Sequence, residues 1–96
     1  MAFLLHEAVA ATSSVKTVSA LSVPYNATSA LLQAATNNVR YTMDGSTNPT
    51  VSSGMLLLTT EDATEFLIED IKNIRFIRDG GTDGSLNIHY YAGRDV

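Results

Sequence analysis

Hydrophobic and polar residues alternate along several short segments of the chain, which is the period of a β-strand with one buried face. The first such segment runs from Val15 to Val23. Pro24 ends it, because proline has no amide hydrogen to donate to a β-ladder, and Asn26 tolerates turn geometry. A second strand is expected over Ser29–Ala34. The first third of the chain therefore predicts β-structure.

The middle of the chain continues this pattern after an Asn-Asn turn. Val39–Met43 is expected to form a third strand, which ends at Asp44 and Gly45, a dipeptide that favours tight turns because both residues accept positive φ. A polar loop over residues 46–50 follows, and Gly54–Leu58 is an apolar run of strand length. Two further strands are therefore expected here.

The segment from Thr60 to Ile74 is compatible with two different elements. A helix capped by Thr60 would place an apolar stripe on one face, formed by Ala63, Phe66, Leu67, Ile71 and Ile74. The alternative is a strand over Thr64–Ile68, a turn at Glu69 and Asp70, and a strand over Ile74–Arg78. Short strands at about 8 to 12 residue spacing surround this segment, as in a sandwich or barrel. We therefore expect strands, with at most one helical turn near Asp70–Asn73.

A glycine-rich turn over residues 79–84 precedes a last strand over Ser85–Tyr91. In that strand one face carries Leu86, Ile88 and Tyr90, and the other carries Asn87, His89 and Tyr91. The expected fold is all-β: a single small antiparallel β-sandwich or barrel of about seven short strands, formed by residues 15–96.

Residues 1–14 are expected to form either an N-terminal arm or the first strand of the domain. Their apolar run has no cationic residues and is interrupted by Glu7, so a secretory signal is not expected. On the arm hypothesis, Phe3, Leu4 and Leu5 dock onto a neighbouring chain, because apolar surface left in water costs about 25 cal/mol per Å². On the alternative, these residues pair within the domain's own sheet.

Composition narrows the classes of protein that this chain can represent. With 96 residues it has room for one domain, and with no Cys its stability must come from packing or from partner chains. Six Lys and Arg against ten Asp and Glu give a net charge of -4, which argues against a nucleic-acid-binding surface. No apolar stretch is long enough for a membrane-spanning helix. We therefore expect neither nucleic acid nor membrane as a partner.

Candidate catalytic groups are few. His6 and His89, the only histidines, are far apart in the sequence, so a zinc site is not expected. Glycosidase chemistry needs one shielded carboxylic acid opposite a second carboxylate. The acidic residues instead form one run with a solvated pattern: Glu61, Asp62, Glu65, Glu69 and Asp70. No nucleophile elbow or phosphate-binding loop is present. We therefore expect no enzyme, no catalytic residue, no cofactor and no metal.

The strand and turn at Asp44 have a family resemblance. Val39–Ser46, followed by Pro49 and Thr50, is similar to the RYTxDGSxPT segment of Ig-like β-sandwich modules, such as the C-terminal domain of chitobiase-type hexosaminidases. The physical content of this segment is a strand that ends in a tight turn, so it indicates a local shape and no function.

A longer pattern, over roughly residues 17–91, resembles small structural proteins of tailed-bacteriophage virions. It comprises Val23–Ala34, Val39–Gly45, Pro49 and Thr50, Gly54–Leu57, Ile74–Arg78 and Leu86–Tyr91. This chain departs from the pattern by the additional Asn48, by the acidic stretch over residues 61–70, and by residues 1–16, which do not align.

The resemblance implies a non-enzymatic virion structural protein, most concretely a capsid decoration or cement protein that binds the head shell as a symmetric oligomer, with a trimer favoured. Its partners would be the major capsid protein or neighbouring virion subunits, and it would be located in the virion after assembly in the host cytoplasm. The candidate partner-binding residues are apolar and aromatic: Phe3, Leu4, Leu5, Tyr25 and Tyr91.

Two alternatives stand beside this interpretation. One is another minor head or tail component. The other is a carbohydrate-binding or accessory Ig-like module, which would offer aromatic rings to sugar rings. The chain has no Trp, four Tyr and three Phe, some of which the core must use, and this composition disfavours sugar binding.

Overall fold

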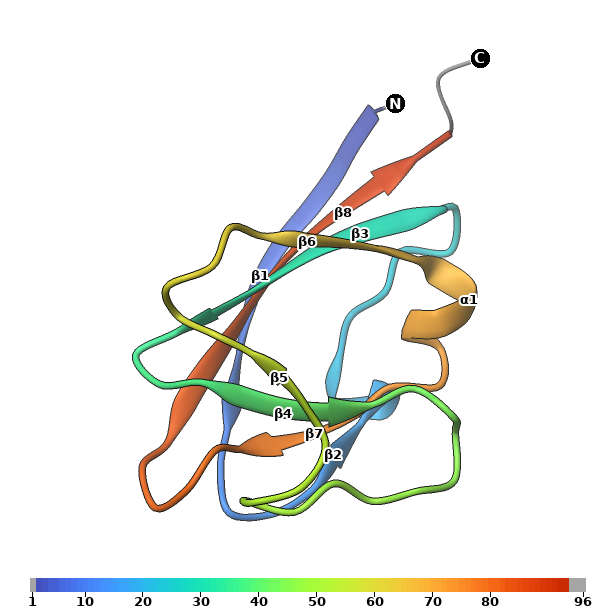
Figure 1. Ribbon diagram of the computed structural model, residues 1–96. Helices are drawn as coiled ribbons and strands as arrows, with labels where there is room; N and C mark the ends of the chain where they lie inside the picture. The colour runs from blue at the N-terminus through green and yellow to red at the C-terminus, as the bar shows by residue number, and fades with distance from the viewer. Residues whose placement is uncertain (1, 94–96) are drawn as a thin grey trace.

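The computed structural model describes residues 2–93, which form two four-stranded antiparallel sheets packed face to face (Figure 1). Sheet A has the strand order β1-β8-β3-β6, and sheet B has the order β2-β7-β4-β5. The expected all-β sandwich is confirmed, with eight strands in place of about seven. Met1 and residues 94–96, which the expected boundaries 1–14 and 15–96 include, lie outside the described residues.

Sheet A is built around β8 (Gly84–Ala92), which pairs with β1 (Ala2–Ala11) on one side and with β3 (Ser29–Ala35) on the other. The short strand β6 (Thr64–Leu67) pairs with β3 at the far edge. A register shift interrupts the β1–β8 ladder between Phe3 and Leu5. Ala2–Ala11 thus lie in the domain's own sheet, and β1 begins beside the end of β8 (Figure 1).

Sheet B is smaller. Its central strands β7 (Arg75–Arg78) and β4 (Val39–Thr42) pair with each other. The edge strands are β2 (Lys16–Thr17), which pairs with β7, and β5 (Met55–Leu57), which pairs with β4.

The expectation of one strand over Val15–Val23 was wrong beyond Thr17. A 3-10 helix, η1 (Val18–Ala20), follows β2, and the Thr17 hydroxyl accepts a hydrogen bond from the backbone N–H of Ser19. A threonine side chain that caps a turn in this way competes with the β-ladder for backbone groups, so alternation alone overestimated the strand.

The ambiguous segment over residues 60–74 is a strand followed by one helical turn. β6 leads directly into α1 (Ile68–Ile71), which begins before the expected turn at Asp70–Asn73. Ile68 and Ile71 are both buried, so the turn places its two isoleucines against the core. The strand interpretation therefore described this segment better than a long helix.

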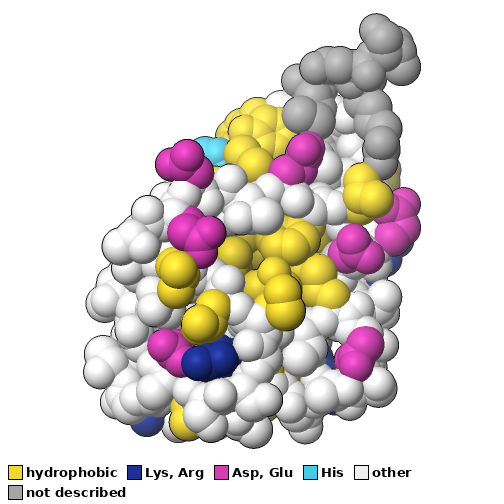
Figure 2. Space-filling model, in the orientation of Figure 1, with side chains coloured by type: hydrophobic (Ala, Val, Ile, Leu, Met, Phe, Trp, Pro, Cys, Tyr) yellow, Lys and Arg dark blue, Asp and Glu magenta, His cyan; other side chains and the backbone are white. Residues whose placement is uncertain are grey.

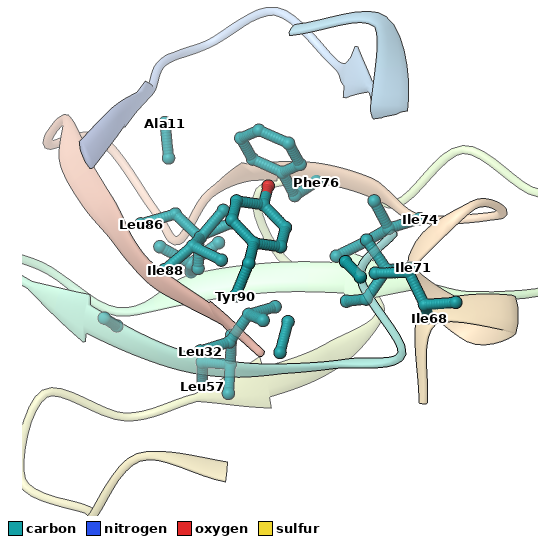
Figure 3. Close-up of a cluster of buried hydrophobic side chains, with 14 residues drawn as sticks. Ala11, Leu32, Leu57, Ile68, Ile71, Ile74, Phe76, Leu86, Ile88 and Tyr90 are labelled. Atoms are coloured by element: carbon teal, nitrogen blue, oxygen red, sulfur yellow. The ribbon is translucent and has the colours of Figure 1, made fainter. Parts of the chain in front are cut away.

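The core lies between the two sheets (Figure 3). The largest side chains without exposed surface come from both sheets and from the segment around α1: Tyr90, Phe76, Leu32, Ile71, Ile74, Leu86, Ile88 and Val39. The hydroxyl of Tyr90 donates a 2.7 Å hydrogen bond to Oε2 of Glu7 on β1. This bond ties the edge strand of sheet A to the centre of the core.

Candidate functional site

Sheet A has one face in the core and one in solvent, and we call the second the outer face. Side chains of adjacent strands that point the same way form rows across a sheet. Register and alternation give four such rows on the outer face: Phe3–Tyr91–Ser29–Leu67, His6–His89–Leu31–Glu65, Ala8–Asn87–Gln33, and Ala10–Ser85–Ala35. Ala63, just before β6, lines a hollow together with Gln33.

Aromatic rings cluster where β1 and β8 meet on the outer face. The ring of Phe3 contacts His89 and Tyr91 edge-on, with centroid distances of 5.0 and 5.9 Å. His6 contacts His89 in the same geometry at 4.9 Å. Phe3 is nevertheless 54% exposed. These rings hold each other in place and leave an apolar surface open to solvent.

The rows of the outer face are nearly free of charge. Among the described residues in these rows, Glu65 is the only carboxylate, and there is no Lys or Arg. Removing a charged side chain from water is costly unless a partner compensates for the lost hydration. A face with one carboxylate can therefore be covered by another protein at low cost, as in the core of a protein interface.

A shallow hollow of about 170 Å³ lies between the second and third rows, and its lining comprises His6, Leu31, Gln33, Ala63, Asn87 and His89. This lining has no Phe, Tyr or Trp on which a sugar ring could stack. Within residues 2–93, no group of three or more His, Cys, Asp or Glu side chains is placed to hold a metal ion. The same residues contain no helix of the length and hydropathy needed to cross a membrane.

The residues expected to bind partners lie in three different environments. Phe3 and Tyr91 are brought together on the outer face. Leu4 and Leu5 are half-buried and pack against the core. Tyr25 is fully exposed in the loop between η1 and β3, outside the rows of the outer face.

The partner-binding residues expected from the sequence do not include His6, His89 or Leu67, which the structure places on this surface. Alternation in the last strand puts His89 on the same face as Tyr91, and this signal could have identified His89. The position of His6 opposite His89 depends on the pairing of β1 with β8, which joins the two ends of the chain.

A second apolar surface lies over the space between β5 and β6, where hydrophobic side chains gather among acidic residues (Figure 2). On β5, Met55 and Leu56 are 64% and 39% exposed. The rings of Tyr41 and Phe66 meet edge-to-face at 5.7 Å and join the two sheets. Burial, with a smaller effect of the Glu61 carboxylate, raises the pKa of Tyr41.

The segment around Asp44 is a structural turn. The Asp44 carboxylate accepts hydrogen bonds from the Thr47 hydroxyl and from the backbone N–H groups of Thr47 and Ser46, and these bonds lower its pKa to about 2. Arg75 donates to the carbonyl oxygens of Gly45 and Ser46 and, at 2.7 Å, to Oδ1 of Asn48. Asn48 thus helps to hold the loop against β7.

Comparison with family models, with curated proteins and with solved structures finds no match to this chain.

Proposed function

We propose that this chain is a non-enzymatic structural protein of a tailed-bacteriophage virion, and that it decorates the head shell as a homo-oligomer. Its partners are the major capsid protein or neighbouring virion subunits. The observation that carries the proposal is the outer face of sheet A, where Phe3 and Leu67 are exposed and Glu65 is the only charged residue among the described positions of the rows. The sequence resemblance to virion structural proteins supports the same role.

The outer face suits protein contact better than small-molecule chemistry. Exposed apolar side chains gain about 25 cal/mol per Å² when a partner covers them. The histidines on this face contact each other and Phe3, and no nucleophile is paired with them among the described residues. Assembly uses this surface without a catalytic group.

The test is the composition of virions of the phage whose genome encodes this chain. Mass spectrometry of purified virions should detect the chain in a fixed ratio to the major capsid protein, and antibody labelling should place it on the head. Purified chain should also co-sediment saturably with expanded heads. Absence from the virion and from the head pellet would refute the proposal, whereas labelling on the tail would favour a tail component.

The alternative, a carbohydrate-binding module, rests on the hollow, whose imidazole and carboxamide groups can exchange hydrogen bonds with a polyol. The lining has no Phe, Tyr or Trp ring on which a sugar ring could stack. Titration with a panel of oligosaccharides, followed by NMR signals of His6 and His89, decides between the two functions. Saturable shifts at those residues, together with no binding to heads, would establish the alternative.

A further inference from the structure

The outer face of sheet A is self-complementary, and we propose that it binds the same face of a second copy of this chain, about a two-fold axis parallel to the strands. The inference rests on the proposed function for its biological meaning and deepens it by naming one partner. Its evidence is the order of residues in the first three rows of the outer face.

A half-turn about an axis that lies in the interface and runs parallel to the strands reverses the order of each row across the sheet. The position of each row along the strand direction does not change. β1 of one copy then lies over β6 of the other, and β8 lies over β3. Each side chain of a row therefore meets the side chain at the opposite place in the same row.

The first row brings apolar groups together. Phe3 and Leu67, which are 54% and 43% exposed, stand at its two ends. In the proposed dimer each Phe3 packs against Leu67 of the second copy, and this contact occurs twice because the axis is two-fold. The most exposed apolar side chains of the face are thereby covered.

The second row provides charge complementarity. His6 and Glu65 stand at its ends, and His89 and Leu31 lie between them. An imidazole has an N–H donor whether it is neutral or protonated, so His6 of one copy can donate to the Glu65 carboxylate of the other. The single carboxylate in the rows of each copy thus receives a partner when it leaves water.

The third row has matched polar and small groups. Asn87 meets Gln33 of the second copy, so that each carboxamide faces another carboxamide with a donor and an acceptor. Ala8 meets Ala63, and two methyl groups at this position let the backbones approach. The first three rows therefore match under one two-fold operation.

The available area is sufficient for a specific contact. Four strands about 4.8 Å apart with a mean length of about 25 Å give roughly 500 Å² per copy, or about 1,000 Å² for a dimer, which reaches the lower range of specific interfaces. Packed sheets cross at about 30°, which displaces an edge strand by about 4 Å, less than the separation of about 7 Å between rows. Side chains of the same row therefore still face each other when the two sheets cross at this angle.

Other arrangements fit the rows less well. A two-fold axis perpendicular to the strands would place β6 over β6 and Glu65 against Glu65, which is a like-charge contact. The trimer expected from the sequence would need a head-to-tail contact between two different patches. The order of the rows favours the two-fold dimer.

The first test is a charge exchange, followed by sedimentation velocity of the full chain over a concentration series. Wild type should sediment as twice 10.3 kDa at high concentration. His6→Asp, which places an acid against Glu65, should weaken the dimer at least about tenfold. His6→Asp with Glu65→Lys should restore it, because these positions are three strands, about 14 Å, apart within one copy and can pair only between copies.

The control is Leu56→Asp, which places the same carboxylate on an exposed residue of β5 and should leave the dimer unchanged. Circular dichroism tests whether each variant is folded. A monomer or a trimer for wild type, an unchanged dimer for His6→Asp, or a double variant as weak as the single one would each overturn the proposal.

The second test uses the absence of Cys from the chain. A mixture of Phe3→Cys and Leu67→Cys chains should form the mixed disulfide in preference to either disulfide-linked homodimer. An excess of wild-type chain should suppress the mixed disulfide. Preferred Phe3→Cys homodimers would overturn the proposed axis. Co-sedimentation of the wild-type chain with phage heads is a separate measurement. A wild-type monomer that still binds heads would overturn the dimer and leave the virion assignment standing.

Discussion

At the scale of single residues, the two polar groups with the clearest structural roles are Glu7 and Asp44. Glu7 projects from β1 toward the core, where Oε2 accepts from the Tyr90 hydroxyl at 2.7 Å and from the backbone N–H of Ser22 at 2.9 Å. Asp44 is exposed and organises a loop. One carboxylate therefore connects an edge strand to the core, and the other shapes a turn.

Tyr90→Phe should lower the free energy of unfolding by about 1–2 kcal/mol, because the charged acceptor Glu7 loses a buried donor. Burial and the contact with Glu7 raise the pKa of Tyr90 above 10.0, so wild type should also lose stability as the pH rises above that value, and the variant should lose less. Urea unfolding measures both effects. Tyr25→Phe, at a fully exposed tyrosine, is the control and should change nothing.

Asp44→Asn should make the free energy of unfolding less dependent on pH at acid pH. The pKa of Asp44 is about 2 in the folded chain, against an ordinary aspartate value of 3.8, so the unfolded chain takes up the proton first as the pH falls. The contribution of this carboxylate is present above pH 3.8 and is lost toward pH 2. The urea midpoint of wild type should therefore fall more between pH 5 and pH 2.5 than that of the variant. Asp62→Asn should follow wild type, and equal slopes for both variants would contradict the assignment.

At the scale of elements, β8 organises sheet A because both of its neighbours are long. Its first residue, Gly84, lies against the turn between β3 and β4. A Cβ at Gly84 would lie 2.8 Å from the backbone oxygen of Asn37, whose side chain donates to the carbonyl oxygens of Asp79 and Thr82. The start of β8 is thus packed against a turn that cannot move independently.

Gly84→Ala should destabilise the fold by roughly 1–3 kcal/mol, because the added methyl group meets backbone and not a flexible side chain. Gly81→Ala is the matched control, since nothing lies within 4 Å of its added Cβ. Thermal unfolding of the two variants measures the difference. Equal melting temperatures would show that the turn accommodates the methyl group.

At the scale of the whole molecule, the sandwich is completed by the chain's two ends. β1 supplies Leu5 and Val9 to the core side of sheet A and carries Phe3 and His6 on the outer face. Removal of an arm that only docked onto a neighbour would leave the domain folded. Removal of a strand that is paired within the sheet would disrupt the fold.

Deletion of residues 1–11 should therefore abolish cooperative unfolding, because it exposes one edge of β8 and the inner side chains that β1 covers. Phe3→Ala should retain a cooperative transition, since Phe3 lies mainly on the surface. Circular dichroism against urea distinguishes the two. A truncated chain with the wild-type transition would show that β1 is dispensable for folding.

Local sequence patterns predict most strands and turns of this protein. Alternation located β3, β4 and β8 to within about two residues, and Asp44 with Gly45 marked the end of β4. These features follow from the local chain, because side-chain period and turn chemistry act between residues close in sequence. The same reasoning overestimated the strand after Thr17, where a local hydroxyl cap competes with the ladder.

Which residues form the outer face depends on how the strands pair in the folded protein. Glu7 and Tyr90 are 83 residues apart in the sequence and are in hydrogen-bond contact in the fold. Alternation assigns a side chain to one of two faces, but it does not say which strand lies beside it or in which register. The contacts of Phe3 with Tyr91 and of His6 with His89 exist because β8 returns to pair with β1. A pairing between the two ends of the chain is set by packing of the whole core.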